Sequence, residues 1–509
     1  MCAGAGAGPA DAAMNDLRAI MAGGPLTLAE GWREACAASA EGLSKKLAEG
    51  LPLYGVNTGF GKLASTRIPP EDLARLQVNL VRSHAAGTGP LLRAPVVRLV
   101  LALKAISLSK GASGVRPEVV EALLALLRHD VLPAIPARGS VGASGDLAPL
   151  AHMSLVLIGE GEATTPEGTR LAGHEAMARA GVAPLVLGPK EGLALLNGTQ
   201  VSTALAIAGL LAAEDLLRTA LVSGAMSVEA ARGSDTPFDA RIHALRYQPG
   251  QTRTAATLRA LLAGSAIRDS HRINDPRVQD PYSLRCQPQV AGACLDLLDN
   301  AAAMLAREAE AVTDNPLVVS DGKGGFDLLS GGNFHAEPVA FAADTIALAL
   351  SETAAIAERR IALLTDPALS GLPAFLVRDG GLNSGFMIAH VTAAALASET
   401  KILAAPRSVD SLPTSANQED HVSMATGAAL RLSDMAENVA AILAIELLAA
   451  AQGIGFHRPL RSSAPIEAAF DLVRSVADPW IEDRVMATDI AAVKTLVEQG
   501  AFCAICPDV

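Results

Sequence analysis

Apolar residues recur at the spacing of an α-helix along most of the chain beyond residue 190. Alanine and leucine dominate there, and runs of β-branched residues, which favour strands, are scarce. The pattern is strongest in long stretches at 199–230, 289–312, 337–364, 386–404 and 426–452. No short fixed period relates one stretch to the next, so they predict a helical bundle and not a solenoid.

The first part of the chain carries shorter elements of more mixed character. Helical patterns cover 71–86, 92–110 and 117–127. Farther along, short strands are predicted near 318–319 and 326–328. We therefore expect an all-α, mainly helical protein, with a smaller N-terminal mixed region (residues 1–115) before a long central helical bundle (116–509).

The charge balance of the chain indicates which kinds of partner are not expected. The 509 residues include 41 basic and 53 acidic side chains, a net charge of −12, and lysine and arginine form no block. Nucleic acid and anionic membrane surfaces are therefore not expected as partners. Half of the residues are apolar but only 3% are aromatic, which favours helices that pack closely through alanine.

Cysteine usage and the N-terminus indicate the compartment. Six cysteines are too sparse for a disulfide framework in a chain of this length. Residues 1–9 lack the charged segment and apolar run of a signal peptide, and we expect a flexible lead-in. Residues 192–213 are uncharged, but polar side chains crowd their first half, which favours a helix buried in protein. We expect a reduced, cytoplasmic protein without a membrane span.

One short loop, residues 138–150, stands apart from this helical background. Its glycines at 139, 142 and 145 predict a tight, crowded turn, because glycine allows positive φ and close backbone approach. The loop lacks the Gly-Lys-Ser/Thr of a phosphate loop and the spacing of a nucleophile elbow. Its glycines alone indicate no more than a turn.

Within this loop, Ala143, Ser144 and Gly145 are suited to cyclisation of the backbone. If the nitrogen of Gly145 attacks the carbonyl carbon of Ala143, a five-membered ring closes between small residues. Loss of water from the ring and from Ser144 leaves an exocyclic methylidene, which is a strong electrophile. Segment 139–150 resembles the aromatic amino acid ammonia-lyase family. The resemblance implies a 4-methylidene-imidazol-5-one (MIO) group made from these three residues, with no external cofactor.

The resemblance runs from about residue 53 to the helices after 450, and several polar segments make it more specific. Ser83-His84 occupies the position that selects the substrate, and Glu419 stands where the phenylalanine and tyrosine relatives tend to have aspartate. Segment 333–338 also looks like the histidine branch. The resemblance thus implies deamination of L-histidine to trans-urocanate and ammonia.

The same resemblance implies which residues carry the reaction. Tyr54 is the base that takes the β-proton, and Tyr282 supports MIO formation and the amine step. Arg285 is the clamp for the substrate carboxylate, since guanidinium presents two donors side by side. A structural ion pair with a neighbouring acid is the alternative role for Arg285.

Other residues are implied to bind the substrate. Asn197 and Gln279 position either the MIO oxygen or the substrate carboxylate. His84 and Glu419 contact the imidazole through hydrogen bonds that an apolar analogue cannot make, and Phe334 forms an apolar wall. Proton transfer is the alternative role for Glu419.

The sequence predicts no metal site and leaves two rival functions open. His335 and Glu337 are two residues apart and Glu419 to His421 are contiguous, without the ligand spacing of a zinc site. The family resemblance implies a homotetramer whose active sites combine loops from neighbouring subunits. The rivals are a tyrosine or phenylalanine ammonia-lyase or aminomutase on the same scaffold, and an inactive helical binding scaffold.

Overall fold

The computed structural model describes residues 9–273, 275 and 277–507, so residues 1–8 of the predicted lead-in lie outside the described residues. The chain forms two compact units. The first comprises Met1–Ala208, Ala302–Asp344 and Pro406–Leu430, and the second comprises Gly209–Ala301, Thr345–Ala405 and Arg431–Val509. A boundary between residues 115 and 116, which the sequence predicts, stays a prediction.

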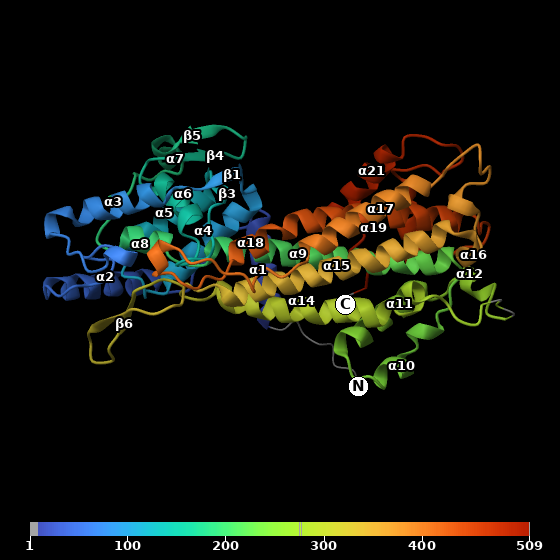
Figure 1. Ribbon diagram of the computed structural model, residues 1–509, viewed down its shortest axis with the longest axis horizontal. Coiled ribbons are helices and arrows are strands. Elements are labelled where there is room, and N and C mark those ends of the chain that lie inside the picture. The colour runs from blue at the N-terminus through green and yellow to red at the C-terminus, as the bar shows by residue number, and fades with distance from the viewer. Residues whose placement is uncertain (1–8, 274, 276, 508–509) are drawn as a thin grey trace. The chain divides into compact units, whose positions relative to one another are not determined.

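The first unit combines helices with small antiparallel sheets (Figure 1). Its helices are α1 (Pro9–Met21), α2 (Trp32–Ala48), α3 (Leu73–His84), α4 (Ala94–Ser109), α5 (Pro117–Arg128), α6 (Leu147–Leu157), α7 (Gly173–Arg179), α8 (Glu191–Leu196) and α18 (Ala425–Leu430). The strands are β1 (Thr88–Leu91), β2 (Leu132–Pro133), β3 (Pro136–Arg138), β4 (Glu162–Thr164), β5 (Arg170–Ala172), β6 (Leu317–Ser320) and β7 (Phe326–Leu329). They pair in the orders β1-β3, β2-β4-β5 and β6-β7.

The second unit is built from helices. It contains α10 (Ala240–Ala244), α11 (Pro249–Leu262), α12 (Ala266–Asp269), α13 (Tyr282–Arg285), α16 (Pro367–Ser370), α17 (Met387–Leu403), α19 (Leu432–Gly455), α20 (Ala464–Arg474) and α21 (Met486–Glu498). Most of α9 (Gln200–Ala230), α14 (Gln287–Ala309) and α15 (Glu337–Thr365) also belongs to it. Short 3₁₀ turns complete the chain at Gly61–Leu63, Pro70–Asp72, Thr236–Phe238, Ala374–Leu376 and Ser415–Asn417.

Helix α4 lies at the centre of the first unit. Every residue from Val96 to Ser109 is buried, and the helix packs against α1, α2 and α5. A helix that is apolar on all sides is stable only when protein surrounds it. Two basic side chains, Arg98 and Lys104, are buried with it, and each must find polar partners inside the protein.

In the second unit α19 packs against α17 and α21, and most of its residues from Val439 to Ile454 are buried. The carboxylate of Glu446 lies within this core, paired with Arg360 and accepting hydrogen bonds from the hydroxyls of Ser223 (2.7 Å) and Ser227 (2.8 Å). A buried ion pair whose remaining lone pairs are satisfied in this way is tolerated in an apolar core.

The structure confirms the all-α prediction, and it confirms the short strands near 318–319 and 326–328. These strands are β6 and β7, an antiparallel pair in register from Leu317↔Leu329 to Ser320↔Phe326. One long stretch that the sequence predicts as a single helix is divided in the structure. Residues 426–452 form two helices, α18 and α19, which are separated at Arg431.

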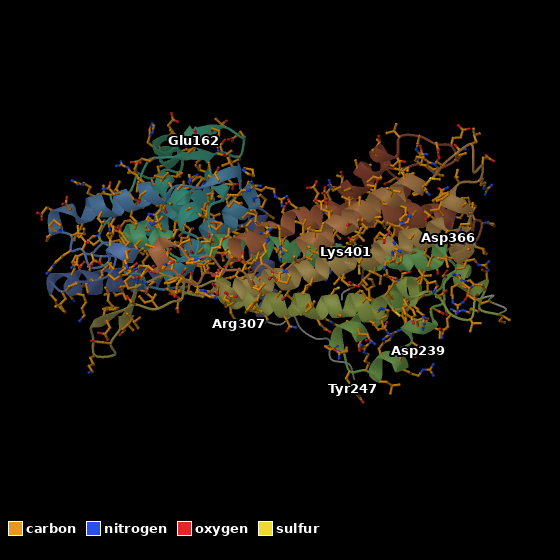
Figure 2. All side chains as sticks on the ribbon, in the orientation of Figure 1. Glu162, Asp239, Tyr247, Arg307, Asp366 and Lys401 are labelled. Atoms are coloured by element: carbon orange, nitrogen blue, oxygen red, sulfur yellow. The ribbon has the colours of Figure 1, made fainter. Side chains whose placement is uncertain are left out.

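Two helical stretches, Glu337–Thr365 and Ala425–Gly455, are long and apolar enough to cross a membrane. Their most apolar windows are 61% and 83% buried, as expected for core helices of a folded protein. Charged side chains such as Glu162, Arg307 and Lys401 are exposed (Figure 2).

Candidate active site

The loop between β3 and α6 is the tight turn that its glycines predict. Gly142 and Gly145 have φ of 84° and 77°, and Ser144 itself has a positive φ of 49°. The amide of Gly145 donates to the carbonyl of Gly142 at 3.3 Å. A positive φ in a residue with a Cβ is sterically unfavourable, so the loop holds Ser144 in a conformation that an unconstrained chain rarely adopts.

Gly198, between α8 and α9, fixes the other side of this turn. Its N–H donates to the carbonyl oxygen of Ser144 (3.3 Å), and its own carbonyl accepts from the amide of Asp146 (2.8 Å). A Cβ added to Gly145 would lie 2.1 Å from the carbonyl oxygen of Gly198. Only glycine at 145 therefore permits this close approach of the two backbones.

Asp146 anchors the loop to two helices. Its buried carboxylate accepts hydrogen bonds from the backbone N–H (2.7 Å) and hydroxyl (2.9 Å) of Ser202 in α9, and from the hydroxyls of Thr426 in α18 (2.5 Å) and Ser140 (3.2 Å). Burial raises the pKa of Asp146 above its usual range although these bonds oppose the shift. The sequence places Asp146 beside the motif, but nothing in it predicts this role.

A cavity of about 820 Å³ opens beside the loop. All of its lining residues belong to the first unit. Among them are six residues that the sequence predicts for the site, namely Tyr54, His84, Ser144, Asn197, Phe334 and Glu419. Ala143 and Gly145 flank Ser144 in the chain. The fold thus brings most of the predicted set to one concave surface, the usual setting of a small-molecule site.

Tyr54 lies in the loop that precedes α3, and that loop is held together internally. The buried side chain of Asn57 accepts from the amide of Leu53 (2.7 Å) and donates to the carbonyl of Leu51 (2.9 Å). The amide of Gly61 donates to the phenolic oxygen of Tyr54 at 3.2 Å. An N–H aimed at this oxygen stabilises negative charge on it, which is a useful property in a residue predicted to act as a base.

His84, near the end of α3, offers a lone pair to the cavity. Its Nδ1 lies 2.9 Å from the carbonyl oxygen of Leu80, which can only accept, so Nδ1 carries the hydrogen and Nε2 does not. Burial lowers the pKa of His84 below its usual range, although the Leu80 contact and the charge of Glu419 oppose the shift. Burial thus favours the neutral ring, in which Nε2 is the acceptor.

Glu419 reaches the same cavity from a strand-like turn. Its backbone pairs with that of Thr414 in both directions, at 2.9 and 3.3 Å, and the Thr414 hydroxyl donates to Oε2 at 2.8 Å. The carboxylate is thus oriented by one short loop, and its charge acts on His84. Together the two residues present acceptors, which suits a ligand that carries ring N–H groups.

Asn197 supplies a polar atom beside the turn. Its amide nitrogen donates to the carbonyl of Asn315 (3.0 Å), and Asn315 Oδ1 in turn accepts from the amide of Gly331 (2.7 Å). The Oδ1 of Asn197 is buried and has no hydrogen-bond partner among the described residues. Because an unpaired buried acceptor is costly, this atom is suited to a ligand or to a rearranged loop.

Three predicted residues belong to the second unit and do not line this cavity: Gln279, Tyr282 and Arg285. The Tyr282 side chain is 71% exposed, and the Arg285 guanidinium carbon lies 4.7 Å from the centre of its ring. The Nε of Arg285 is buried without a hydrogen-bond partner, and no carboxylate of the described residues pairs with this side chain. The alternative role of Arg285 in a structural ion pair therefore has no partner in the described part of the chain.

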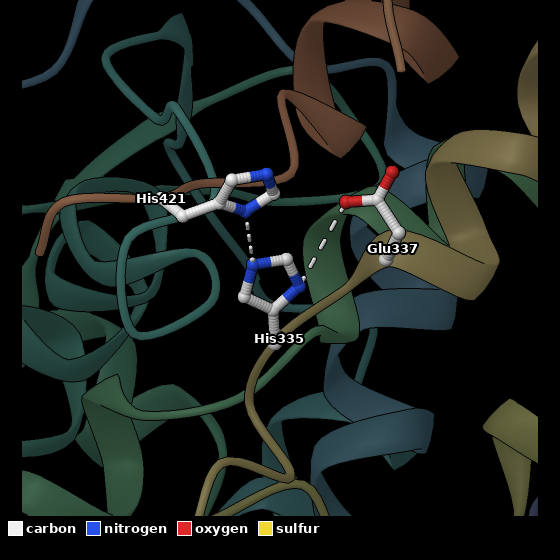
Figure 3. A group of neighbouring side chains, drawn as sticks. All are labelled: His335, Glu337 and His421. Carbon is white, nitrogen blue, oxygen red and sulfur yellow. Dashed lines mark hydrogen bonds and ion pairs between the residues drawn. The ribbon is translucent and has the colours of Figure 1, made fainter. Parts of the chain in front are cut away.

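The fold also joins His335, Glu337 and His421, which no sequence spacing connects (Figure 3). The Nδ1 of His421 lies 3.3 Å from Nε2 of His335, whereas Glu337 faces the other nitrogen of His335 at 3.9 Å. A metal ion takes one nitrogen from each imidazole, and here the two neighbours of His335 face different nitrogens. The hydrogen bond between His335 and His421 links the loop of Phe334 to the loop of Glu419, whereas Glu337 makes only the longer ion-pair contact.

Comparisons with known proteins identify the family. A profile of the aromatic amino acid lyase family matches residues 13–475. The chain belongs to this family.

Individual relatives are similar over nearly the whole chain. A histidine ammonia-lyase from Aromatoleum aromaticum is 62% identical over 458 residues, which cover 90% of this chain and 86% of that protein. The crystal structure of histidine ammonia-lyase from Trypanosoma cruzi matches with a TM-score of 0.88 at 43% identity, covering 97% of this chain and 92% of that one. A tyrosine aminomutase from Streptomyces globisporus matches with a TM-score of 0.90 at 35% identity, covering 97% and 96%.

Proposed function

We propose that this chain is a carbon–nitrogen lyase that deaminates L-histidine to trans-urocanate and ammonia. The observation that carries the proposal is the cavity in which Ser144 of the cyclisation loop meets His84 and Glu419. The 62% identity to a histidine ammonia-lyase supports the same substrate.

The loop fits the MIO group that the family uses. Ala143, Ser144 and Gly145 lie in a turn with positive φ at Ser144 and no room for a side chain at position 145. The Oδ1 of Asn197, next to Gly198 in the chain, has no hydrogen-bond partner among the described residues. When formed, the group supplies an electrophile that captures the substrate amine and so makes it a better leaving group. Asn197 and Gly198 would hold the group from the side of α8.

The remaining chemistry falls to side chains of the cavity. Tyr54 takes the proton from the β-carbon, with the negative charge on its oxygen stabilised by the Gly61 amide at 3.2 Å. A neutral imidazole carries a single N–H, and His84 accepts a hydrogen bond from it through Nε2, or Glu419 accepts it through its carboxylate. Proton transfer is the alternative role of Glu419. Phe334 covers the ring of the substrate as an apolar wall. Each of these roles is a proposal from position and chemistry.

Product analysis tests the reaction and separates it from its nearest rivals. We expect L-histidine to give trans-urocanate and ammonia in equal amounts, with little turnover of L-tyrosine or L-phenylalanine. An aminomutase would instead give a β-amino acid without stoichiometric ammonia. A chain that releases ammonia from tyrosine or phenylalanine but not from histidine would refute the substrate proposal.

His84→Leu is expected to change the substrate preference. The lost acceptor leaves an imidazole N–H unpaired in the cavity, so kcat/KM for L-histidine should fall roughly a hundredfold while that for L-phenylalanine rises. His174→Leu, at an exposed position outside the cavity, is the matched control. An unchanged preference in His84→Leu would remove this residue from the account of specificity.

We further propose a homotetramer in which a neighbouring subunit contributes Gln279, Tyr282 and Arg285 to each site. Exposed apolar side chains on two long helices support association: Leu348 on α15, and Ile388, Val391 and Ile402 on α17. Such side chains are unfavourable in water and typical of subunit interfaces. An active monomer in solution, detected by light scattering, would refute the proposal.

Arg285→Lys is expected to lower kcat/KM roughly a hundredfold, because an ammonium cannot hold a carboxylate through two parallel bonds. If sites are shared, refolding Arg285→Lys chains together with Ser144→Ala chains should restore part of the activity, since mixed oligomers contain complete sites. Mixing Ser144→Ala with Tyr54→Phe should restore none, because both residues line the cavity of one chain. Recovery in neither mixture would place Arg285 outside a shared site.

We place the enzyme in the cytoplasm. The described cysteines, Cys36, Cys286, Cys294, Cys503 and Cys506, are all free thiols, which fits a reducing compartment. Measured in a fractionated extract, activity is expected with the cytoplasmic fraction.

A further inference from the structure

Lys104 is an unusual residue for the middle of α4, in which every residue from Val96 to Ser109 is buried. It is 1% exposed, and its ammonium donates to the backbone carbonyl of Asn197 (2.6 Å) and to the side-chain oxygen of Gln200 (3.3 Å). A buried ammonium costs free energy unless polar partners replace water. Both partners belong to one segment, the junction between α8 and α9.

A second buried lysine, Lys190, differs from Lys104 in its hydrogen-bond partners. Lys190 pairs with the carboxylate of Asp314 at 2.5 Å and also donates to the carbonyl of Ser113 (2.9 Å). Lys104 has no carboxylate within hydrogen-bond distance among the described residues, so both of its hydrogen-bond acceptors are neutral. Burial lowers its pKa to about 7, with Asp314 and Asp146 opposing that shift and Lys190 adding to it.

The junction that Lys104 holds is the one that fixes the cyclisation loop. Gly198 stands between Asn197 and the start of α9, and it bonds to Ser144 and Asp146 on either side of Gly145. Lys104 therefore bonds to the same junction that the cyclisation loop contacts through Gly198. The ammonium does not line the cavity and touches none of the reacting atoms.

We propose that Lys104 is a positioning residue for formation of the MIO group, which rests on the proposed function. In ring closure a bond forms between the nitrogen of Gly145 and the carbonyl carbon of Ala143. The oxygen of Ala143 leaves as water with the amide hydrogens of Gly145 and Ser144. Ser144 then loses its hydroxyl with its α-hydrogen as a second water, and no oxidant is needed. The loop contracts during these steps, and Lys104 holds Gly198 still against that movement.

Intact-mass measurement of freshly synthesised chains, sampled while they fold and before they have cyclised, tests the inference without relying on turnover. Lys104→Met keeps the volume of the side chain but removes its donors, and we expect loss of the two waters to slow roughly tenfold or more. Lys104→Arg keeps charged donors and should restore most of the rate. Gln200→Leu releases the same ammonium from its second acceptor, so a smaller slowing is expected there even if Lys104→Met does not fold.

Two controls separate positioning from general destabilisation. Arg98→Met removes another buried cation from α4, one that bonds to the carbonyls of Ile20 and Gly24 and to Asp130, away from the junction. Lys110→Met removes an exposed lysine just after the helix. Both variants should lose the two waters at the wild-type rate once folded, as judged by circular dichroism.

The outcomes are distinguishable. Cyclisation of folded Lys104→Met at the wild-type rate overturns the inference, and so does an equal slowing in folded Arg98→Met. A wild-type chain that keeps both waters refutes the proposed function itself.

Discussion

Replacing Ser144 with alanine is expected to abolish deamination of L-histidine, lowering kcat by roughly three orders of magnitude or more. The variant has no hydroxyl to lose, so the methylidene that makes the loop electrophilic does not form. The rest of the site should remain intact, because the Ser144 contact to Gly198 is made by its backbone carbonyl. Initial rates and the intact mass of the same preparation check this prediction together.

The matched control is Ser154→Ala. Ser154 is buried in the helix that follows the loop, and among the described residues its hydroxyl bonds only to the carbonyl of Leu150 (2.7 Å) in the same helix. Near-wild-type activity is expected there. Substantial activity in Ser144→Ala would show that the reaction does not depend on this loop.

Tyr54→Phe is the second substitution with a large expected effect, a loss of roughly 10²- to 10⁴-fold in kcat with little change in fold. The aromatic ring and its packing stay. Only the phenolic oxygen is lost, which accepts the β-proton and the hydrogen bond from the Gly61 amide. Initial rates with L-histidine, compared with circular dichroism of the same preparation, check this prediction.

Tyr247→Phe is the control for this change, since Tyr247 is 87% exposed in the second unit (Figure 2). It should leave the rate unchanged. Near-wild-type turnover by folded Tyr54→Phe would count against Tyr54 as the base.

The long helices were predictable because their signal is local. Stretches such as 199–230 and 337–364 read as helix from periodicity alone, and α9 and α15 begin and end within one residue of those bounds. The break at Arg431 was not predictable. Its guanidinium bonds to the carbonyls of Leu403 and Ala405, and contacts with a distant segment leave no trace in the local pattern.

The same distinction separates the parts of the site. Ala143, Ser144 and Gly145 could be proposed from the sequence because their chemistry lies in three consecutive residues, and Tyr54 and His84 because short motifs surround them. Asp146 anchors the loop through residues as far away as Thr426, and Lys104 acts through a backbone carbonyl 93 residues along the chain. Every residue has a backbone carbonyl, so no sequence motif could have predicted that contact.

The most direct test of the proposed reaction records near-ultraviolet absorbance of the purified enzyme with L-histidine, L-tyrosine and L-phenylalanine in parallel, with Ser144→Ala beside each. We expect a conjugated acrylate to appear from histidine only, and only when Ser144 is present. Turnover of tyrosine or phenylalanine in place of histidine would contradict the assignment of His84 and Glu419. The same absorbance change in Ser144→Ala would contradict the self-made electrophile on which the whole account rests.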